Sequence, residues 1–269
     1  MLENILKPLF LFNLKTTVMT AIAFASLCLT GCKRGDRETK TINGIECVLV
    51  EAGTFMMGSP ASENERYSDE TQHKVTLTKD YWISKYPVTQ AQYKAVTKTN
   101  PSNEYGIGDN YPVYFVNFNE AVAFCNSVGG RLPTEAEWEF AARGGNKSRG
   151  YTYSGSDNLN DVGWYYDNIS NQKDDDFGYG TRPVGQKKPN ELGIYDMTGN
   201  VWEWCSDWYG AYPSGAVTDP TGPGSGSNRV LRGGSWSSVW QICRVAARDF
   251  WPPSDRDTDW GIRVAFDAN

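Results

Sequence analysis

Two long stretches of the sequence, 146–188 and 207–228, combine glycine, asparagine and aspartate with aromatic residues and show no sustained helical or strand periodicity. Unstructured linkers share the polar composition but contain few aromatic residues. Many tryptophan and tyrosine rings are unfavourable to leave exposed to water. The two stretches therefore predict an irregular shell that packs on aromatic rings and is held by side-chain hydrogen bonds or ions.

Composition indicates a globular chain and excludes several classes of function. The 269 residues include 10 Trp, all after residue 80, with 15 Tyr and 11 Phe, and such rings bury a large surface per residue. The formal net charge of −6 offers no basic surface, so nucleic acid is not expected as a partner. The single histidine, His73, excludes metal sites built from two or three imidazoles.

The N-terminus has the pattern of a bacterial lipoprotein signal peptide. An uncharged apolar run at 17–30 follows Lys7 and Lys15, and the tetrapeptide LTGC occupies 29–32. The run is too short for a permanent membrane span, which needs about 20 residues. The tetrapeptide is similar to a lipobox, where cleavage precedes a cysteine that carries a diacylglyceryl group. An ordinary secretory peptide with a chance cysteine is the alternative.

These features predict three segments along the chain. A lipoprotein signal peptide is expected at 1–31, a flexible stalk that begins with lipidated Cys32 at 32–43, and one folded domain at 44–269. The stalk is predicted because 33–43 almost lacks apolar side chains. The expected location is the bacterial cell envelope, outside the cytoplasm, with the lipid membrane as a partner through Cys32. The choice of membrane stays open.

Local patterns predict short strands and three helices in the folded part. Apolar and β-branched residues indicate strands at 46–55, 74–77, 81–86, 229–231 and 261–266. Helices are expected at 89–98, 119–128 and 134–143, with N-caps at Thr89, Asn119 and Thr134. Glu137 completes a capping box with Thr134.

The four cysteines beyond Cys32 do not define a site by their spacing. They are Cys47, Cys125, Cys205 and Cys243. An oxidising compartment permits disulfides between them, in any of three pairings. Buried free thiols that pack as small apolar groups are an equal alternative.

Three motifs in order resemble the formylglycine-generating enzyme family, also known as sulfatase-modifying factors. They are GRLPTEAEWEFAARG at 130–144, NELGIYDMTGNVWEW at 190–204 and RVLRGGSW at 229–236, and GIRV follows at 261–264. The resemblance runs from about residue 47 to 267. It implies a single α+β domain with a loop-rich fold, a variant of the C-type lectin fold.

Calcium is the cofactor that the second motif favours. Two carboxylates seven residues apart, with glycine between them, suit a hard cation that accepts side-chain and carbonyl oxygens. The resemblance implies ligation by the side chains of Asp196 and Glu203 and by the carbonyls of Gly199 and Val201. The alternative is a tight turn in which Asp196 caps locally and Glu203 pairs with an arginine.

A second calcium site is suggested by three adjacent aspartates at 174–176, which repel one another unless a cation is near. Alignment with the family places Asp161, Val162, Asp176 and Gly178 at its other calcium site. A solvated acidic loop is an equally weighted alternative.

The prediction of whether the family's oxidase activity is present depends on the segment at 233–248 (GGSWSSVWQICRVAAR). Active members of the family have cysteines three and eight residues after the GGS serine. Counted from Ser235, those positions hold Ser238 and Cys243; counted back from the RVAAR sequence, Cys243 replaces a non-catalytic residue. Copper(I) prefers paired thiolates, so at most one thiol disfavours copper and predicts that the oxidase activity is lost.

Other catalytic arrangements are weaker. A Ser/His/Asp triad would need His73, which we expect at the surface because its neighbours are polar. Glu135, Glu137 and Glu139 could serve as paired acids, but helix-surface charge and capping explain them more simply.

The remaining expectation is a binding module for a protein or a glycan. The candidate residues around the former active cleft are Ser235, Trp236, Ser238, Trp240 and Arg248. Trp240 and Trp251 lie in a variable segment beside this cleft, and exposure of at least one ring and burial of both are equal alternatives. Two alternatives stay open: an oxidase, or altered thiol chemistry, that uses Cys243 alone, and a structural subunit of an envelope complex.

Overall fold

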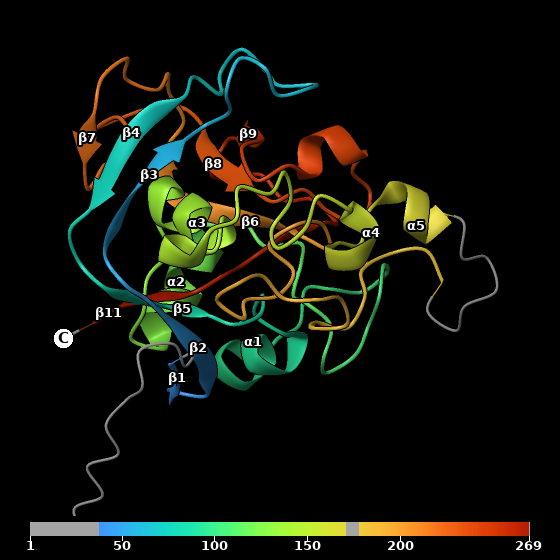
Figure 1. Ribbon diagram of the computed structural model, residues 1–269. Helices are drawn as coiled ribbons and strands as arrows, with labels where there is room; N and C mark the ends of the chain where they lie inside the picture. Colours follow the sequence, from blue (N-terminus) through green and yellow to red (C-terminus); the bar gives the residue numbers. More distant parts are fainter. Residues whose placement is uncertain (1–37, 171–177, 269) are drawn as a thin grey trace, which may run out of the picture. The chain divides into compact units, whose positions relative to one another are not determined.

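The computed structural model describes residues 38–170 and 178–268, which belong to one unit of the chain that runs from Arg37 to Asn269. The predicted signal peptide and Cys32 lie outside the described residues. Across 38–170 and 178–268, no helix has the length and apolar character to cross a membrane. Figure 1 shows short strands and helices connected by long irregular segments, as the sequence predicted.

The first sheet joins the two ends of the described chain. Its strands, all antiparallel, follow the order β1 (Thr39–Ile42), β2 (Ile45–Val50), β5 (Tyr81–Ser84) and β11 (Ala265–Asp267). Asn43 and Gly44, both at positive φ, form the turn between β1 and β2, a pair of residues typical of tight hairpins. The predicted stalk is therefore too long, because β1 lies inside it and pairs with β2.

Two further sheets complete the strand structure. One has the order β10 (Trp260–Gly261), β6 (Trp202–Trp208), β8 (Arg229–Arg232) and β9 (Arg248–Trp251), and the other has β3 (Gly53–Met57), β4 (His73–Leu77) and β7 (Val217–Thr218). The predicted strand at 261–266 is in fact two, since β10 and β11 belong to different sheets. Sequence periodicity missed β6, because its first four residues are all buried and do not alternate.

The helices agree with the capping signals at two of three sites. α1 (Gln90–Thr97) and α3 (Glu135–Ala142) begin after Thr89 and Thr134, and each has a complete capping box. α2 (Phe118–Ser127) is capped by Asn117, which corrects the predicted cap at Asn119. Asn117 pairs with Glu120 three residues later in the reciprocal box, and this combination selects it over Asn119.

Short elements interrupt the irregular regions. These are α4 (Leu159–Val162), α5 (Tyr166–Ser170) and the 3₁₀ turns Gly145–Lys147 and Trp240–Cys243. Side-chain hydrogen bonds hold the intervening loops, as expected. The amide of Asn190, for example, donates to the carbonyl of Ala141 and accepts from the backbone of Leu192 and Ile194.

The hydrophobic core surrounds α3 and the middle sheet. α3 packs against β3, β6 and β8 (Figure 1). Trp138 on α3 and Trp204 on β6 are fully buried. The indole N–H of Trp204 donates to the carbonyl of Val116 at 3.0 Å, so this ring is satisfied as well as buried. The packing of α3 against β8 positions the end of this strand, and the candidate site follows directly after it.

Candidate functional site

The candidate site begins at the sharp turn that follows β8. Gly233 and Gly234 both adopt positive φ, at 102° and 72°, which other residues rarely tolerate. A Cβ on Gly234 would lie 2.7 Å from the sulfur of Cys243. The two glycines therefore allow the turn to close directly over the Cys243 thiol.

Cys243 is part of the core. Its side chain is 0% exposed, in a cluster with Tyr153, Leu159, Val162 and Tyr165. Burial raises the pKa of this thiol far above its ordinary value, and a contact from the Ser235 backbone opposes that only in part. A protonated, enclosed thiol is a poor nucleophile and a poor metal ligand.

The expected second sulfur position contains a buried polar cluster instead. Ser238 Oγ accepts from the backbone N–H of Ser235 at 2.9 Å and lies 3.0 Å from Ser235 Oγ. Ser235 and Ser237 both donate to Oδ2 of Asp259, at 2.5 and 2.7 Å. Burial raises the pKa of Asp259, although these serine hydroxyls lower it. Sequence analysis missed Asp259, whose partners lie more than 20 positions away.

The tryptophans of this segment divide into buried and exposed. Trp236 is 4% exposed, and its ring contacts those of Tyr105 and Tyr179 at 5.1 and 4.7 Å. Trp240 and Trp251 are 38% and 43% exposed, so the exposed alternative describes this structure. Trp240 and Trp251 therefore present aromatic surface to solvent.

An aromatic patch surrounds Trp240. We give this name to the exposed side chains Tyr166, Tyr179, Val239 and Trp240. The backbone N–H of Tyr166 donates to the carbonyl of Ser238 at 2.9 Å, and Tyr179 packs edge-on against Trp236. These contacts place the start of α5 next to the 3₁₀ turn.

Arg248 does not reach this patch. Its Nε and Nη2 donate to the two carboxylate oxygens of Glu135 at 2.7 and 2.9 Å. Arg232 bridges Glu135 and Glu139 at 2.9 and 2.6 Å, and Arg143 also binds Glu139. The expectation of surface charge at Glu135 and Glu139 is wrong, because both are buried against arginines; the capping role of Glu137 is confirmed.

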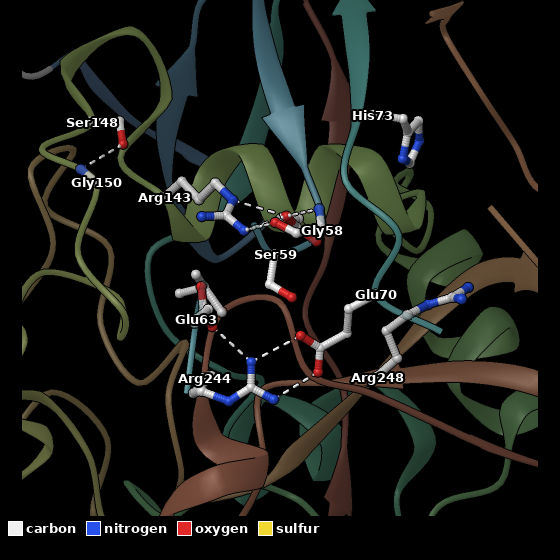
Figure 2. Close-up of polar contacts among 12 residues, drawn as sticks. Gly58, Ser59, Glu63, Glu70, His73, Arg143, Ser148, Gly150, Arg244 and Arg248 are labelled. Atoms are coloured by element: carbon white, nitrogen blue, oxygen red, sulfur yellow. Dashed lines mark hydrogen bonds and ion pairs between the residues drawn. The ribbon is translucent and has the colours of Figure 1, made fainter. Parts of the chain in front are cut away.

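A second arginine network fixes the loop between β3 and β4. Figure 2 shows the Arg244 guanidinium between the carboxylates of Glu63 and Glu70. Arg244 also donates to the carbonyls of Glu65 and Gln241. Burial opposes ionisation of Glu70, but the Arg244 hydrogen bonds and charge lower its pKa overall. Neither Arg244 nor Arg248 is therefore directed at the Cys243 thiol.

At the first predicted calcium site, the Asp196 and Glu203 carboxylates are both buried. Asp196 accepts from the backbone N–H of Gly185 through Oδ2, and Glu203 accepts from Trp138 and Arg263 through Oε2. Within 38–170 and 178–268, the buried atoms Asp196 Oδ1 and Glu203 Oε1 have no hydrogen-bond partner. Burial, together with the Glu203 charge, raises the pKa of Asp196 to about 6. Glu203 does pair with an arginine, Arg263, as the alternative to calcium predicted. This pairing uses Oε2 only, so it does not exclude a cation at the other oxygen.

The second predicted calcium site is described only in part. Asp176 lies outside the described residues. Asp161 Oδ2 lies 3.2 Å from Lys188 Nζ, Val162 is buried in α4, and Gly178 is exposed. Among residues 38–170 and 178–268, no three acidic, histidine or cysteine side chains cluster as metal ligands. A calcium ion at Asp196 and Glu203 would therefore need carbonyl oxygens as well as these two carboxylates.

The remaining cysteines and the histidine are core residues. Cys47, Cys125, Cys205 and Cys243 are all free and buried, so the unbridged alternative describes this structure. His73, predicted at the surface, is only 4% exposed, and its ring packs on Tyr212. The prediction was wrong because it relied on polar sequence neighbours, whereas alternate side chains of β4, including His73, face the interior.

A loop-rich α+β domain with a GGS turn after β8, and with the buried carboxylates of Asp196 before β6 and of Glu203 on β6, matches the class of sulfatase-modifying-factor-like proteins. The family model for the sulfatase-modifying factor enzyme 1-like domain matches residues 33–268, so the chain belongs to this family.

Two sequence relatives and one solved structure are similar to this chain. The chain is 32% identical to the chaperone protein LppX of Paenibacillus barcinonensis, over 92% of this chain and 96% of LppX. It is 42% identical to the formylglycine-generating enzyme of Streptomyces coelicolor, over 60% of this chain and 54% of that enzyme. The structure of Treponema denticola variable protein 1 superposes with a TM-score of 0.72 at 31% identity, over 86% of this chain and 99% of that one.

Proposed function

We propose that this protein is a lipid-anchored, extracytoplasmic family member that has lost cysteine oxidation and binds a protein partner. The observation that carries the proposal is the state of the two sulfur positions. Cys243 is enclosed by the core, and Ser238 is engaged with Ser235. A serine hydroxyl is a hard, protonated group, so the pair provides no soft ligand set for copper(I).

A protein partner is supported by the relatives and by the surface. LppX, which matches almost from end to end, has the name of a chaperone, and chaperones act on polypeptides. The aromatic patch exposes the rings of Tyr166, Tyr179 and Trp240, and exposed aromatic groups are typical of protein interfaces. Glycan stacking on the same rings is the competing outcome.

The anchor is the part of the proposal that the sequence carries alone. Lipidation of Cys32 would hold the folded domain at a membrane surface after the signal peptide is removed. Mass spectrometry of the membrane-extracted protein tests it: we expect an N-terminal diacylglyceryl cysteine at position 32. An unmodified N-terminus at another residue would contradict the anchor.

Calcium is proposed as a structural cofactor at the first site. Asp196 and Glu203 would each contribute one oxygen, and the carbonyls of Gly199 and Val201 would complete the set. Bound calcium would neutralise two buried carboxylates and tie the start of β6 to the preceding loop. Occupancy at 100 times the dissociation constant adds about 2.7 kcal/mol of stability.

Calcium removal tests that cofactor. Chelation is expected to lower the melting temperature, and Asp196→Ala should abolish the response to added calcium. Asp161→Ala is the matched variant at the second site and should leave most of the response intact. A wild-type melting temperature that calcium does not change would refute the proposal.

The oxidase test uses a peptide with the sequence Cys-x-Pro-x-Arg, oxygen and supplied copper(I). We expect no formylglycine product from the wild-type protein. Ser238→Cys provides one more thiol but leaves Cys243 buried, so it should stay inactive as well. Turnover by wild type that Cys243→Ser abolishes would establish the enzyme instead.

The binding test compares two exposed tryptophans. A photo-crosslinking amino acid replaces Trp240 in the aromatic patch or, as the control, Trp251 on β9. In intact cells we expect a discrete protein adduct from position 240 and none from 251. Adducts of equal yield at both positions, or none at either, would contradict a partner at the patch; a membrane-embedded adduct would indicate the envelope-subunit alternative.

A further inference from the structure

A cavity of about 490 Å³ lies between β4, the start of α3 and the loop at 210–223. Cavities of about 300–1,000 Å³ with apolar walls and a few polar groups are typical small-molecule sites. The apolar wall here consists of Met57, Tyr212, Pro213, Val217, Pro220 and Pro223. None of the residues from 233 to 243 lines this cavity, so it is separate from the candidate site above.

His73 contributes a hydrogen-bond acceptor to the cavity wall. Its Nδ1 lies 3.0 Å from the carbonyl oxygen of Thr71, and a ring nitrogen that faces a carbonyl must carry the proton. In the neutral form of an imidazole with a proton on Nδ1, the lone pair lies on Nε2. In the part of the chain that the structure describes, Nε2 has no hydrogen-bond partner, while the Tyr212 ring at 4.7 Å holds the imidazole in place.

The acidic groups around the cavity already accept hydrogen bonds from the protein. Glu135 receives hydrogen bonds from Arg232, Arg248 and the hydroxyl of Tyr212. Asp207 accepts from the backbone N–H of Glu135 at 2.9 Å. Burial, and then the Glu135 charge, raises the pKa of Asp207 to about 7. The cavity therefore does not favour a strongly charged ligand.

We propose that this cavity binds a small neutral aromatic molecule whose N–H or O–H donates to His73 Nε2. Proline, valine and tyrosine side chains pack well on a flat ring, and the His73 acceptor favours a ligand with a donor at its edge. Indole-type and phenol-type rings have both features. The proposal does not depend on the protein partner or on the oxidase question.

The first test uses the fact that His73 is the only histidine. Full-length protein labelled with ¹⁵N in the histidine ring is titrated with indole or with 1-methylindole, which has the same shape but no N–H. Indole should shift the Nε2 resonance saturably, and 1-methylindole should bind roughly tenfold more weakly. Equal affinity for the two probes, or no saturable shift with indole, would overturn the proposal.

Calorimetry on variants provides the second test. Thr218 is exposed on β7 and lines the cavity, so Thr218→Trp should block the cavity and abolish indole binding. Thr41→Trp, on the exposed strand β1 outside the cavity, is the matched control and should bind as wild type. His73→Phe keeps a ring but removes the acceptor, so it should weaken indole roughly tenfold and leave 1-methylindole unchanged. Unaltered indole binding by Thr218→Trp, or by His73→Phe, would refute the site.

Discussion

Asp207→Asn should remove a pH dependence from the stability of this protein. Asp207 is 3% exposed, beneath the loop that carries Gly222, and accepts from the backbone of Glu135 and the hydroxyl of Ser206. Burial, reinforced by the negative charge of Glu135, raises the pKa of this carboxyl from 3.8 to about 7. The folded protein therefore holds this proton more tightly than the unfolded chain does.

The sign and size of the effect follow from that difference. Below about pH 4 the carboxyl is protonated in both states, and its contribution to stability is fully present. As the pH rises to about 7, only the unfolded chain loses the proton, so stability falls. Each pKa unit corresponds to about 1.4 kcal/mol, which gives a loss of about 4 kcal/mol across this window.

Urea unfolding at a series of pH values measures this loss. The free energy of unfolding of wild type minus that of Asp207→Asn should fall by about 4 kcal/mol between about pH 4 and about pH 7. A constant offset between the two proteins does not matter, because only the change with pH is compared. Asp109→Asn, at an exposed aspartate, should follow wild type. Identical pH profiles for wild type and Asp207→Asn would show that Asp207 is ionised in the fold and refute the reasoning.

Three further outcomes are expected. Arg244→Met leaves Glu70 buried without its cation, which should cost about 3–5 kcal/mol in urea unfolding; adding Glu70→Met should restore part of it, and a double variant no more stable than the single one would contradict the ion-pair argument. Thr134→Ala removes the cap of α3 and should lower stability by about 1 kcal/mol, whereas an unchanged melting temperature would show that the capping box is redundant. Cys243 should react with a thiol reagent only as fast as the protein unfolds, and rapid labelling of the native protein would place this sulfur in an open cleft.

Local signals predicted the elements whose structure depends on near neighbours. The N-caps Thr89 and Thr134, and the capping box of α3, are signals within four residues, and the structure has them at the predicted positions. The turn at Asn43 and Gly44 is an equally local signal that was overlooked, so β1 was assigned to the stalk. β6 could not be found from periodicity, because a strand buried on both faces has no alternation.

The candidate site could be predicted less well, because its environment comes from distant parts of the chain. Glu135 and Arg232 form a buried pair across 97 positions, and a helix N-terminus rich in glutamate looks like surface charge until such a partner is known. His73 was misplaced for the same reason, since Tyr212 covers its ring. Asp259 belongs to no motif in the sequence, and its role became visible only through its hydrogen bond with Ser235 of the GGS turn.

The sequence by itself determined the family, the loop-rich architecture and the absence of a cysteine at position 238, because each is written in residue identity and order. Only the tertiary structure decided that Cys243 is sealed beneath Gly234, that Asp196 and Glu203 keep unpaired oxygens, and that a cavity opens beside His73. Reactivity and binding depend on burial, and burial is set by residues that meet only after the chain has folded.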